Sequence, residues 1–363
     1  MIAGATLSSY FARRYLATTL QFFVGVAVII FLADFTELTR RASAHPSYTV
    51  MLGMIVSALR LPLILQMAMP FVILLVSMTT LMALNRKYEL VVTRAAGVSA
   101  WQFLAPLCIV SLLLGVMSTV ALNPIAARAL ASAQEIEATL MGSGAARPAM
   151  SQVPWLRQST DEGATIIGAA HSAREGQLLS EVTFIRLHEN GTVRERIDAR
   201  QAELVPGAWE IRDAIVMRRG NTPEQIESMR LKSNLDPVFL EERFTPPETV
   251  SVYDLPHKIA AARSFGLSGN AFATQFHSLV ALPFQLMAMT LIAATVTMRF
   301  TRMGQPISII VGGIVTGFLL YVVTAVMRAF GSAGIVPPMA AAWFPVLLAG
   351  LYGVTFLLYK EDG

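Results

Sequence analysis

The sequence predicts an α-helical membrane protein with six transmembrane helices and an extracytoplasmic antiparallel β domain, jelly-roll-like, inserted between helices 3 and 4. Hydrophobic residues make up 54% of the 363 residues and charged residues only 14%, well below the roughly 25% typical of soluble proteins. The mean hydropathy is +0.56. The charged residues are concentrated in one segment that lies between apolar runs. A single cysteine, Cys108, excludes a disulfide scaffold.

Six runs of the chain contain no Lys, Arg, Asp or Glu. They span 15–33, 61–84, 100–122, 271–298, 306–327 and 335–359, and the shortest has 19 residues. About 20 apolar residues cross the hydrocarbon core as a helix, so each run predicts a transmembrane helix. The first run could instead be a cleaved signal peptide, but it exceeds the apolar length usual for such peptides.

Lysine and arginine residues near the run ends predict the orientation. With the N-terminus inside, eight lie in cytoplasmic segments: Arg13, Arg14, Arg86, Lys87, Arg94, Arg299, Arg302 and Lys360. Four lie in short outer segments: Arg40, Arg41, Arg60 and Arg328. We therefore expect a multi-pass membrane protein with both termini cytoplasmic and the long segment after the third run on the outer side.

That long segment has the composition of a water-exposed β domain. Residues 123–268 hold 16 of the 28 Lys and Arg residues and 19 of the 24 Asp and Glu residues. Residues 182–188 and 192–197 alternate around Asn190-Gly191, which is typical of a hairpin turn. Further strands are predicted at 164–170 and 208–218, and helical connectors at about 123–140 and 254–263. An antiparallel sandwich or jelly roll suits so many short strands.

Several kinds of chemistry are missing from the sequence. It contains no phosphate-binding loop, no paired-cysteine site and no clustered histidines. No apolar run carries a central charge, which argues against an ion-coupled carrier. We expect no catalytic residue, no metal site and no cofactor in this chain, so energy for any transport must come from elsewhere.

The cytoplasmic segment at about 85–99 favours a short helix, because its charges are mixed and Gly97 follows two alanines. Such a helix at the inner membrane face would suit contact with a cytoplasmic motor. A solvated loop with positive-inside charges explains the composition equally well.

The string ELVVTRAAGVS at 89–99, directly after the second apolar run, resembles the coupling segment of the lipopolysaccharide export permeases, the LptF/LptG family. The resemblance covers essentially the whole chain. It includes GFLLYV at 317–322 and GIVPP at 334–338, and these details are more similar to LptG than to LptF.

The resemblance implies a permease subunit, not an enzyme, that extracts lipopolysaccharide from the inner membrane for outer membrane biogenesis. It implies an LptF-like second permease, an LptB-like ATPase dimer that binds the ATP, and LptC-like then LptA-like periplasmic partners. It places Glu89 against the ATPase, flanked by Arg86 and Arg94.

The resemblance also implies lipopolysaccharide contacts. Arg40 and Arg41 match a basic pair that meets the anionic head of the lipid, and interfacial anchoring is the alternative. Asp34 departs from the lysine of some members. Arg128 is the nearby candidate for a further basic contact.

In the fifth run, Gly313 and Gly317 have the spacing of a close helix interface. Spans one and five of the two family permeases form gates around the lipid, so the glycines could lie at that interface or could pack within the subunit. Phe318 and Tyr321 would line the lipid cavity.

The predicted organisation is helices 1–3 with the coupling helix in 1–122, the β domain with its connectors in 123–268, and helices 4–6 in 269–363. An alternative function from another class is a membrane-anchored periplasmic β-domain scaffold or receptor without transport. Six spans with glycine contacts exceed what an anchor requires.

Overall fold

The computed structural model describes residues 5–43, 48–141, 156–160, 163–173, 178–188, 192–218, 222–233, 246–264, 268–297 and 307–361. Six of its helical segments are long and apolar enough to cross a membrane, which confirms the six predicted spans. The helices of these segments are α1 (Ala5–Ala42), α2 (Val50–Arg86), α4 (Ala100–Met117) with its continuation, α8 (Asn270–Thr297), α9 (Ile307–Ser332) and α10 (Pro338–Glu361). At 1.5 Å per residue, α1 is about 55 Å long and therefore extends beyond a bilayer core.

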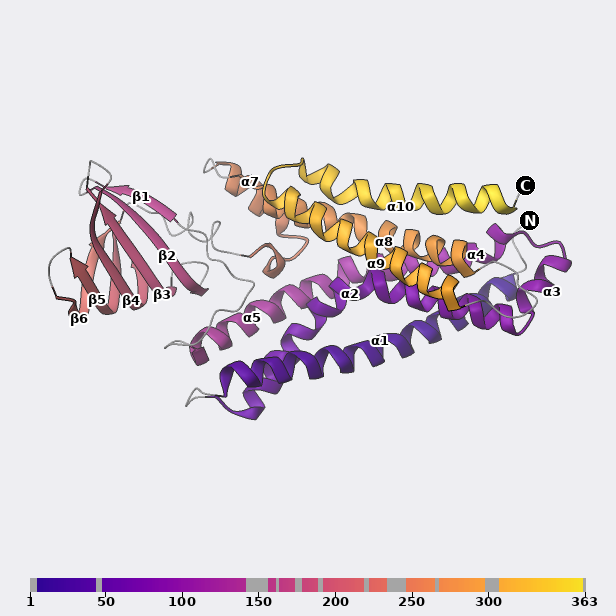
Figure 1. Ribbon diagram of the computed structural model, residues 1–363, viewed down its shortest axis with the longest axis horizontal. Helices are drawn as coiled ribbons and strands as arrows, with labels where there is room; N and C mark the ends of the chain where they lie inside the picture. Colours follow the sequence, from indigo (N-terminus) through magenta and orange to yellow (C-terminus); the bar gives the residue numbers. More distant parts are fainter. Residues whose placement is uncertain are drawn as a thin grey trace.

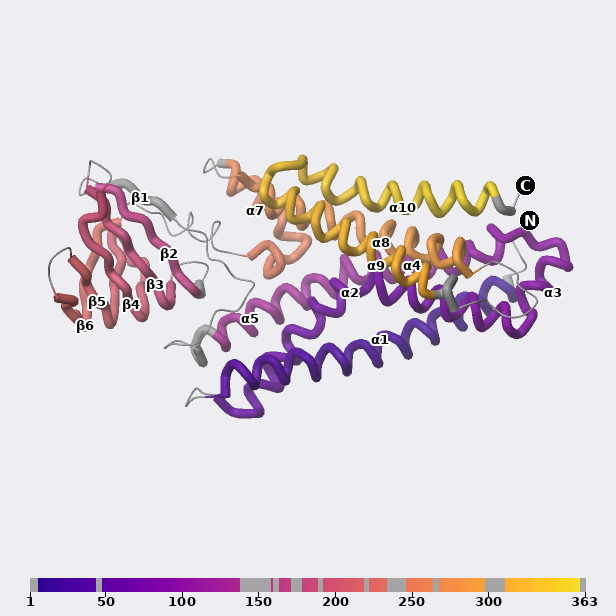
Figure 2. The backbone as a smooth tube through the Cα atoms, viewed as in Figure 1, coloured from indigo at the N-terminus to yellow at the C-terminus, as the bar shows by residue number. Residues whose placement is uncertain are grey.

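Span three is one long helix with an irregular turn. After α4 come a π-helical segment, η1 (Ser118–Leu122), and then α5 (Asn123–Met141). The predicted connector helices are α5 and α7 (Leu255–Ser264), and a 3-10 turn, η3 (Pro247–Thr249), precedes α7. The β sheet lies at one end of the helices, whereas both termini and the short helix α3 (Glu89–Ala95) lie at the other (Figures 1 and 2).

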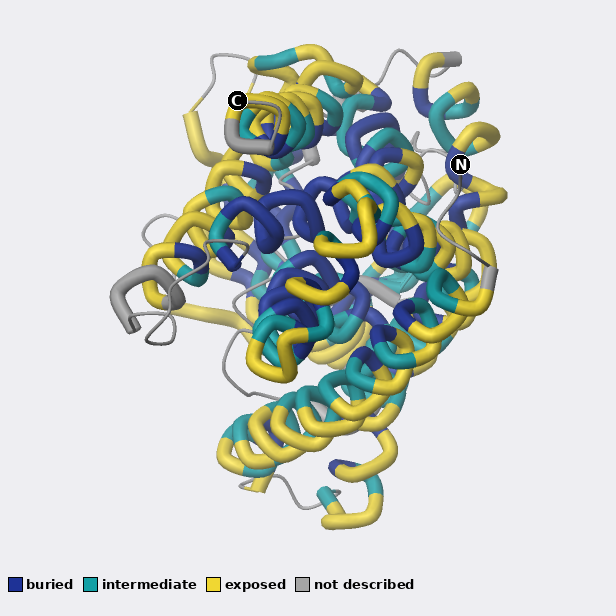
Figure 3. Tube along the Cα trace, turned by 90° about the vertical axis from the view of Figure 1, so that its right-hand side faces the viewer, coloured by how far each residue is buried: buried dark blue, intermediate teal, exposed yellow. Residues whose placement is uncertain are grey.

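Helix α8 is the centre of the bundle. In its most apolar window 78% of residues are buried, against 6% for α1 and 17% for α9. It contacts α10, α2, α4 and α9, and the end-on view shows buried residues gathered in the middle (Figure 3). A Cβ on Gly115 of α4 would lie 2.4 Å from the Cα of Pro283, so this glycine permits the close approach of α4 to α8. Helices α1 and α9 are therefore the peripheral ones.

The insert forms one six-stranded antiparallel sheet whose strands follow each other in sequence order. The strands are β1 (Leu156–Thr160), β2 (Gly163–Ala173), β3 (Leu178–Leu187), β4 (Val193–Val205), β5 (Ala208–Arg218) and β6 (Glu224–Lys232). The antiparallel β prediction is confirmed, and β5 has the predicted bounds. Residues 190–191 lie outside the described residues, but His188 N–H donates to the Thr192 carbonyl at 2.8 Å and joins the two strands there. The sequence analysis missed β1 and β6.

Backbone pairing skips one residue in each of five neighbouring strands, and these form the crease row: Ala170, Glu181, Arg200, Asp213 and Glu227. Glu181 and Asp213 have φ of 51° and 52°, values that non-glycine residues seldom adopt. Buried residues are two apart on either side of the row but three apart across it, as with Ala199 and Ala202. The row therefore reverses which side chains face inward.

The sheet folds on itself along the crease row, because residues from both sides of it share one core. The largest core side chains include Ile167, Phe184, Ile197, Trp209, Ile211, Val216 and Leu231. The two outer strands also meet: Gln158 of β1 donates to the Lys232 carbonyl at 3.3 Å and accepts from Ser233 Oγ at 3.0 Å. A single bent sheet thus makes both layers of the sandwich.

Candidate functional site

Helix α3 has sharp ends. Tyr88 before it has a φ of 57°, and Gly97 after it has a φ of 81°, which suits glycine at a helix C-terminus. The predicted segment at 85–99 thus divides into the end of α2, the seven residues of α3 and the start of α4.

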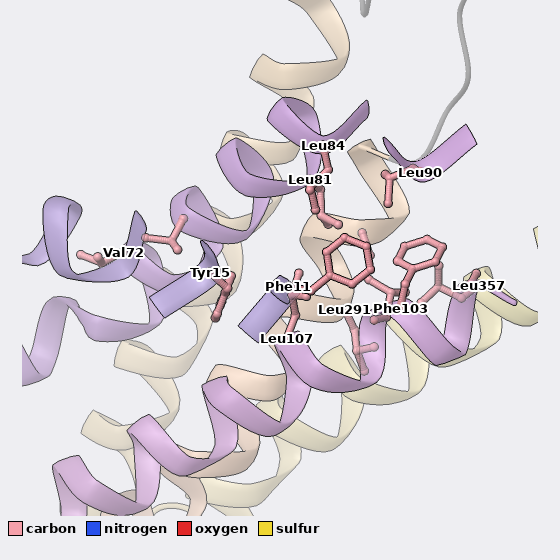
Figure 4. Packing of buried hydrophobic residues seen from close by; sticks show 14 residues of the cluster. Phe11, Tyr15, Val72, Leu81, Leu84, Leu90, Phe103, Leu107, Leu291 and Leu357 are labelled. Atoms are coloured by element: carbon pink, nitrogen blue, oxygen red, sulfur yellow. The ribbon is translucent and has the colours of Figure 1, made fainter. Parts of the chain in front are cut away.

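The inner face of α3 is fixed to the bundle. Leu90 is 2% exposed and lies in one apolar cluster with Phe11, Leu84 and Phe103 (Figure 4). The other buried residue of α3 is Thr93, whose hydroxyl donates to the Glu89 carbonyl at 2.6 Å. Helix α3 is therefore packed against the helices beneath it.

The Glu89 side chain is engaged within the chain. Arg14 Nη1 donates to its Oε1 at 2.8 Å, and the Tyr10 hydroxyl donates to its Oε2 at 3.1 Å. Arg14 also donates to the Tyr10 oxygen at 3.0 Å. The sequence analysis missed both partners, although Tyr10 and Arg14 have the spacing of neighbours on one helix face.

The outer face of α3 is apolar and open to solvent. Tyr88, Val91 and Val92 are exposed by 69%, 40% and 67%. Of the two predicted flanking arginines, Arg86 is exposed, whereas Arg94 is half-buried and has its Nε covered. We call Tyr88, Val91 and Val92 the α3 outer face.

Arg40 and Arg41 are brought together in the last turn of α1, and both bind Glu37. Arg40 donates to the two oxygens of that carboxylate from Nε and Nη2 at 2.9 and 2.8 Å, and Arg41 donates from Nε at 2.5 Å. A carboxylate at i−3 and i−4 is a common helical partner. The sequence analysis missed Glu37.

A second charge cluster joins three helices next to the first. Arg60 of α2 pairs with Glu137 of α5, and its Nη1 lies 3.6 Å from Oδ1 of Asp34 on α1. Asp34 therefore has an oppositely charged partner on α2, and this offsets the cost of placing a carboxylate on the apolar helix α1. Its Oδ2 is buried without a hydrogen bond.

Arg128 lies apart from these ion pairs. It is exposed on α5, and none of the described residues forms a hydrogen bond or ion pair with it. The described residues also contain no group of three His, Cys, Asp or Glu side chains that could hold a metal ion.

The two glycines of α9 face the inside of this subunit. A Cβ on Gly317 would meet Leu74 Cδ2 of α2 at 1.9 Å, and one on Gly313 would meet Met78 Cε at 2.8 Å. These short distances support packing of the two glycines within the subunit rather than against a second permease.

Phe318 and Tyr321 have exposed side chains, at 57% and 37%. They belong to an apolar surface of α9 that none of the described helices covers, together with Val311, Val315, Leu319, Val322, Val326 and Phe330. Helix α1 has a comparable uncovered surface, with Leu16, Leu20, Val24, Val28, Ile29 and Leu32.

The chain matches one protein family, described as lipopolysaccharide export system permease LptF/LptG, over residues 9–360. No curated protein matches it.

Proposed function

Because the chain belongs to the LptF/LptG family of lipopolysaccharide export permeases, we propose that it is the LptG-like subunit through which a separate ATPase drives extraction of lipopolysaccharide from the inner membrane. The observation that carries this proposal is α3. It is a short helix anchored on one face by Leu90 and Glu89 and exposed on the other face as an apolar surface.

On the cytoplasmic side, the α3 outer face would dock into a groove of the LptB-like ATPase dimer, where ATP is bound. Apolar residues at the centre of an interface contribute most when water is excluded. Arg86 would contact the rim. Glu89 accepts a hydrogen bond from Arg14 of α1, so a displacement of α3 would be transmitted to α1 through this pair.

On the outer side, Arg40 and Arg41 would exchange the Glu37 carboxylate for the phosphates of the lipid head. Arginine binds both anions through the same planar fork, so the phosphates would have to displace the Glu37 carboxylate from both side chains. Arg128, with no ion partner among the described residues, would add a further contact.

The uncovered surfaces of α1 and α9 would face the LptF-like permease and enclose the acyl chains, with Phe318 and Tyr321 among the lining residues. Because neither surface is covered within this subunit, a second subunit or lipid must cover both in the membrane.

The folded sheet would pass the lipid to the LptC-like partner and then to the LptA-like bridge. Its outer strands are the places where another strand can add. Strand β1 is short and its Gln158 bonds to the end of β6, so the first part of β6 is the longer available edge. The sheet would be periplasmic, and the end that carries α3 and both termini would be cytoplasmic.

The test is to place a charge on the α3 outer face. Val92→Asp should abolish co-purification of the ATPase, because a carboxylate would be buried in an apolar contact. Val193→Asp is the matched control, since Val193 is 57% exposed on β4 at the far end of the molecule.

The control should retain both the ATPase and lipid export, and both variants should insert in the membrane. Normal ATPase association and export by Val92→Asp would contradict the proposal. Normal association without any lipid-stimulated ATP hydrolysis in the parent protein would favour the scaffold instead.

A further inference from the structure

Span three has an irregularity with a cause in its sequence. Residue 124 is proline, which has no N–H, so the Val120 carbonyl four residues earlier receives no α-helical hydrogen bond there. The helix widens immediately before this point into the π segment Ser118–Leu122, where the Asn123 N–H bonds to the Ser118 carbonyl. Such π segments occur frequently at functional sites.

Groups from three other parts of the chain bond to this segment. The Tyr253 hydroxyl donates to the Val120 carbonyl at 3.0 Å. Gln66 Nε2 of α2 donates to the Ser118 carbonyl at 3.0 Å. Thr119 Oγ1 donates to the Leu279 carbonyl of α8 at 2.8 Å. The vacant carbonyl of the proline turn is thus used by the chain that returns from the sheet.

The adjacent asparagine completes the connection. Asn123 is fully buried, and its Oδ1 accepts from the Val252 N–H at 2.9 Å, while its Nδ2 donates to Gln66 Oε1 at 3.4 Å. A buried amide with bonds on both sides holds its neighbours in one arrangement, because breaking either bond leaves a desolvated polar group.

The returning chain is also held by apolar contacts. Val250, Val252 and Leu255 pack against Phe272 and Leu279 of α8. The η3 turn just before them contacts α5, so the connectors entering and leaving the sheet meet directly above the π segment.

We propose that Gln66, Asn123, Pro124 and Tyr253 form a joint that sets the direction in which the β domain leaves the membrane helices. The four are positioning residues: they would act on the lipid only through the sheet. Asn123 and Tyr253 hydrogen-bond the chain that returns from the sheet to the irregular turn of span three. A change in the π segment would therefore shift the start of α5 and the chain before α7 together. The role in delivery rests on the proposed export function, whereas the geometry of the joint does not.

The test measures the distance between the sheet and the bundle. Spin labels are placed at Val193 on β4 and Met51 at the outer start of α2, both exposed, in a Cys108→Ala background. The transporter is reconstituted with its second permease and ATPase in lipid bilayers. Pulsed electron resonance then gives the distance distribution.

Tyr253→Phe removes one hydrogen bond and keeps the ring, and Pro124→Ala returns an N–H to the helix. Each should increase the population outside the main distance peak by about three- to tenfold, the range that one hydrogen bond allows. The matched controls are Tyr352→Phe, which is exposed on α10, and Pro106→Ala, which lies in the same span as Pro124 but away from the returning chain. Both controls should leave the distribution unchanged.

In the same samples, lipid-stimulated ATP hydrolysis should stay near the parent rate, while release of lipopolysaccharide to the periplasmic partner should fall. Parent-like distances in both variants would overturn the joint, whatever lipid is carried. Altered distances with full release would overturn the positioning role in export. Absence of lipopolysaccharide release by the parent itself would instead count against the proposed function, and the distances would still decide the joint.

Discussion

At the residue scale, carboxylates decide what the arginines of this protein can do. Glu37 accepts hydrogen bonds from both Arg40 and Arg41, and Glu89 accepts one from Arg14. The basic pair at this end of α1 is therefore already neutralised in part, and any anion that binds there would compete with Glu37. Exposed ion pairs are weak because water screens them, so the exchange needs little energy.

Glu37→Gln should strengthen the binding of lipopolysaccharide, because the competing charge is lost while the shape of the side chain is kept. We expect an affinity gain of about two- to fivefold at low salt, shrinking as salt screens the contact. Binding can be measured with labelled lipid on the purified transporter.

Glu135→Gln, an exposed acid on α5, is the control and should change nothing. Weaker binding by Glu37→Gln would mean that Glu37 holds the arginines in place rather than competing with the lipid.

At the element scale, small residues and bends decide how helices and strands meet. Gly115 allows α4 to approach α8, Gly317 allows α9 to approach α2, and the crease row folds one sheet into two layers. Each of these features changes the packing of a helix or strand. None of them changes the apolar sequence pattern that predicts that helix or strand.

Gly317→Ala should destabilise the isolated chain, because the new Cβ would lie within 1.9 Å of Leu74 Cδ2. Forcing a methyl group into a packed contact costs about 1–3 kcal/mol. Gly312→Ala is the control in the same helix, since nothing lies within 4 Å of its Cβ position.

Thermal unfolding of the chain in detergent, without its second permease, measures both variants. Loss of stability that occurs only in the two-permease complex would place Gly317 at the subunit interface instead.

At the scale of the whole molecule, α1 is fixed at both ends and uncovered between them. Its inner end is held by the Glu89 contacts and by Tyr15, whose hydroxyl bonds to Ser77 and Ser111, each at 2.8 Å. Its C-terminal end is held by the Asp34 contact with Arg60. The Glu89 contacts and the Arg40–Arg41 pair therefore lie at opposite ends of one helix.

Arg14→Gln should weaken the stimulation of ATP hydrolysis by lipid while the ATPase still binds, because the α3 outer face is untouched. The lost charge-assisted contact is worth about 1 kcal/mol or more at a partly covered site, so we expect lipid-stimulated turnover to fall by about fivefold. Arg13→Gln, an exposed neighbour, is the control.

Co-purification and lipid-stimulated hydrolysis of the same preparations separate docking from coupling. If Arg14→Gln lost the ATPase altogether, the Glu89 contact would serve to shape the docking surface and not to transmit its movement.

The sequence by itself determined the six spans, the helical connectors and the antiparallel insert, since each rests on a local pattern: the length of a charge-free run, or alternation along a strand. It also determined the family, because ELVVTRAAGVS and the proline and glycine strings are contiguous. It did not reveal β1 or β6, of which the first has 5 residues and the second is largely exposed.

Only the tertiary structure decided what the candidate site residues contact. Glu89 lies 75 residues from Arg14, and the Tyr253 hydroxyl meets a carbonyl 133 residues earlier. Periodicity shows which face of a helix is apolar but not which neighbour covers it, so the inward direction of Gly317 and the exposure of Val92 could not be known beforehand. Such contacts depend on packing between segments that are distant in the sequence, and a local sequence pattern does not identify the segment that will pack against it.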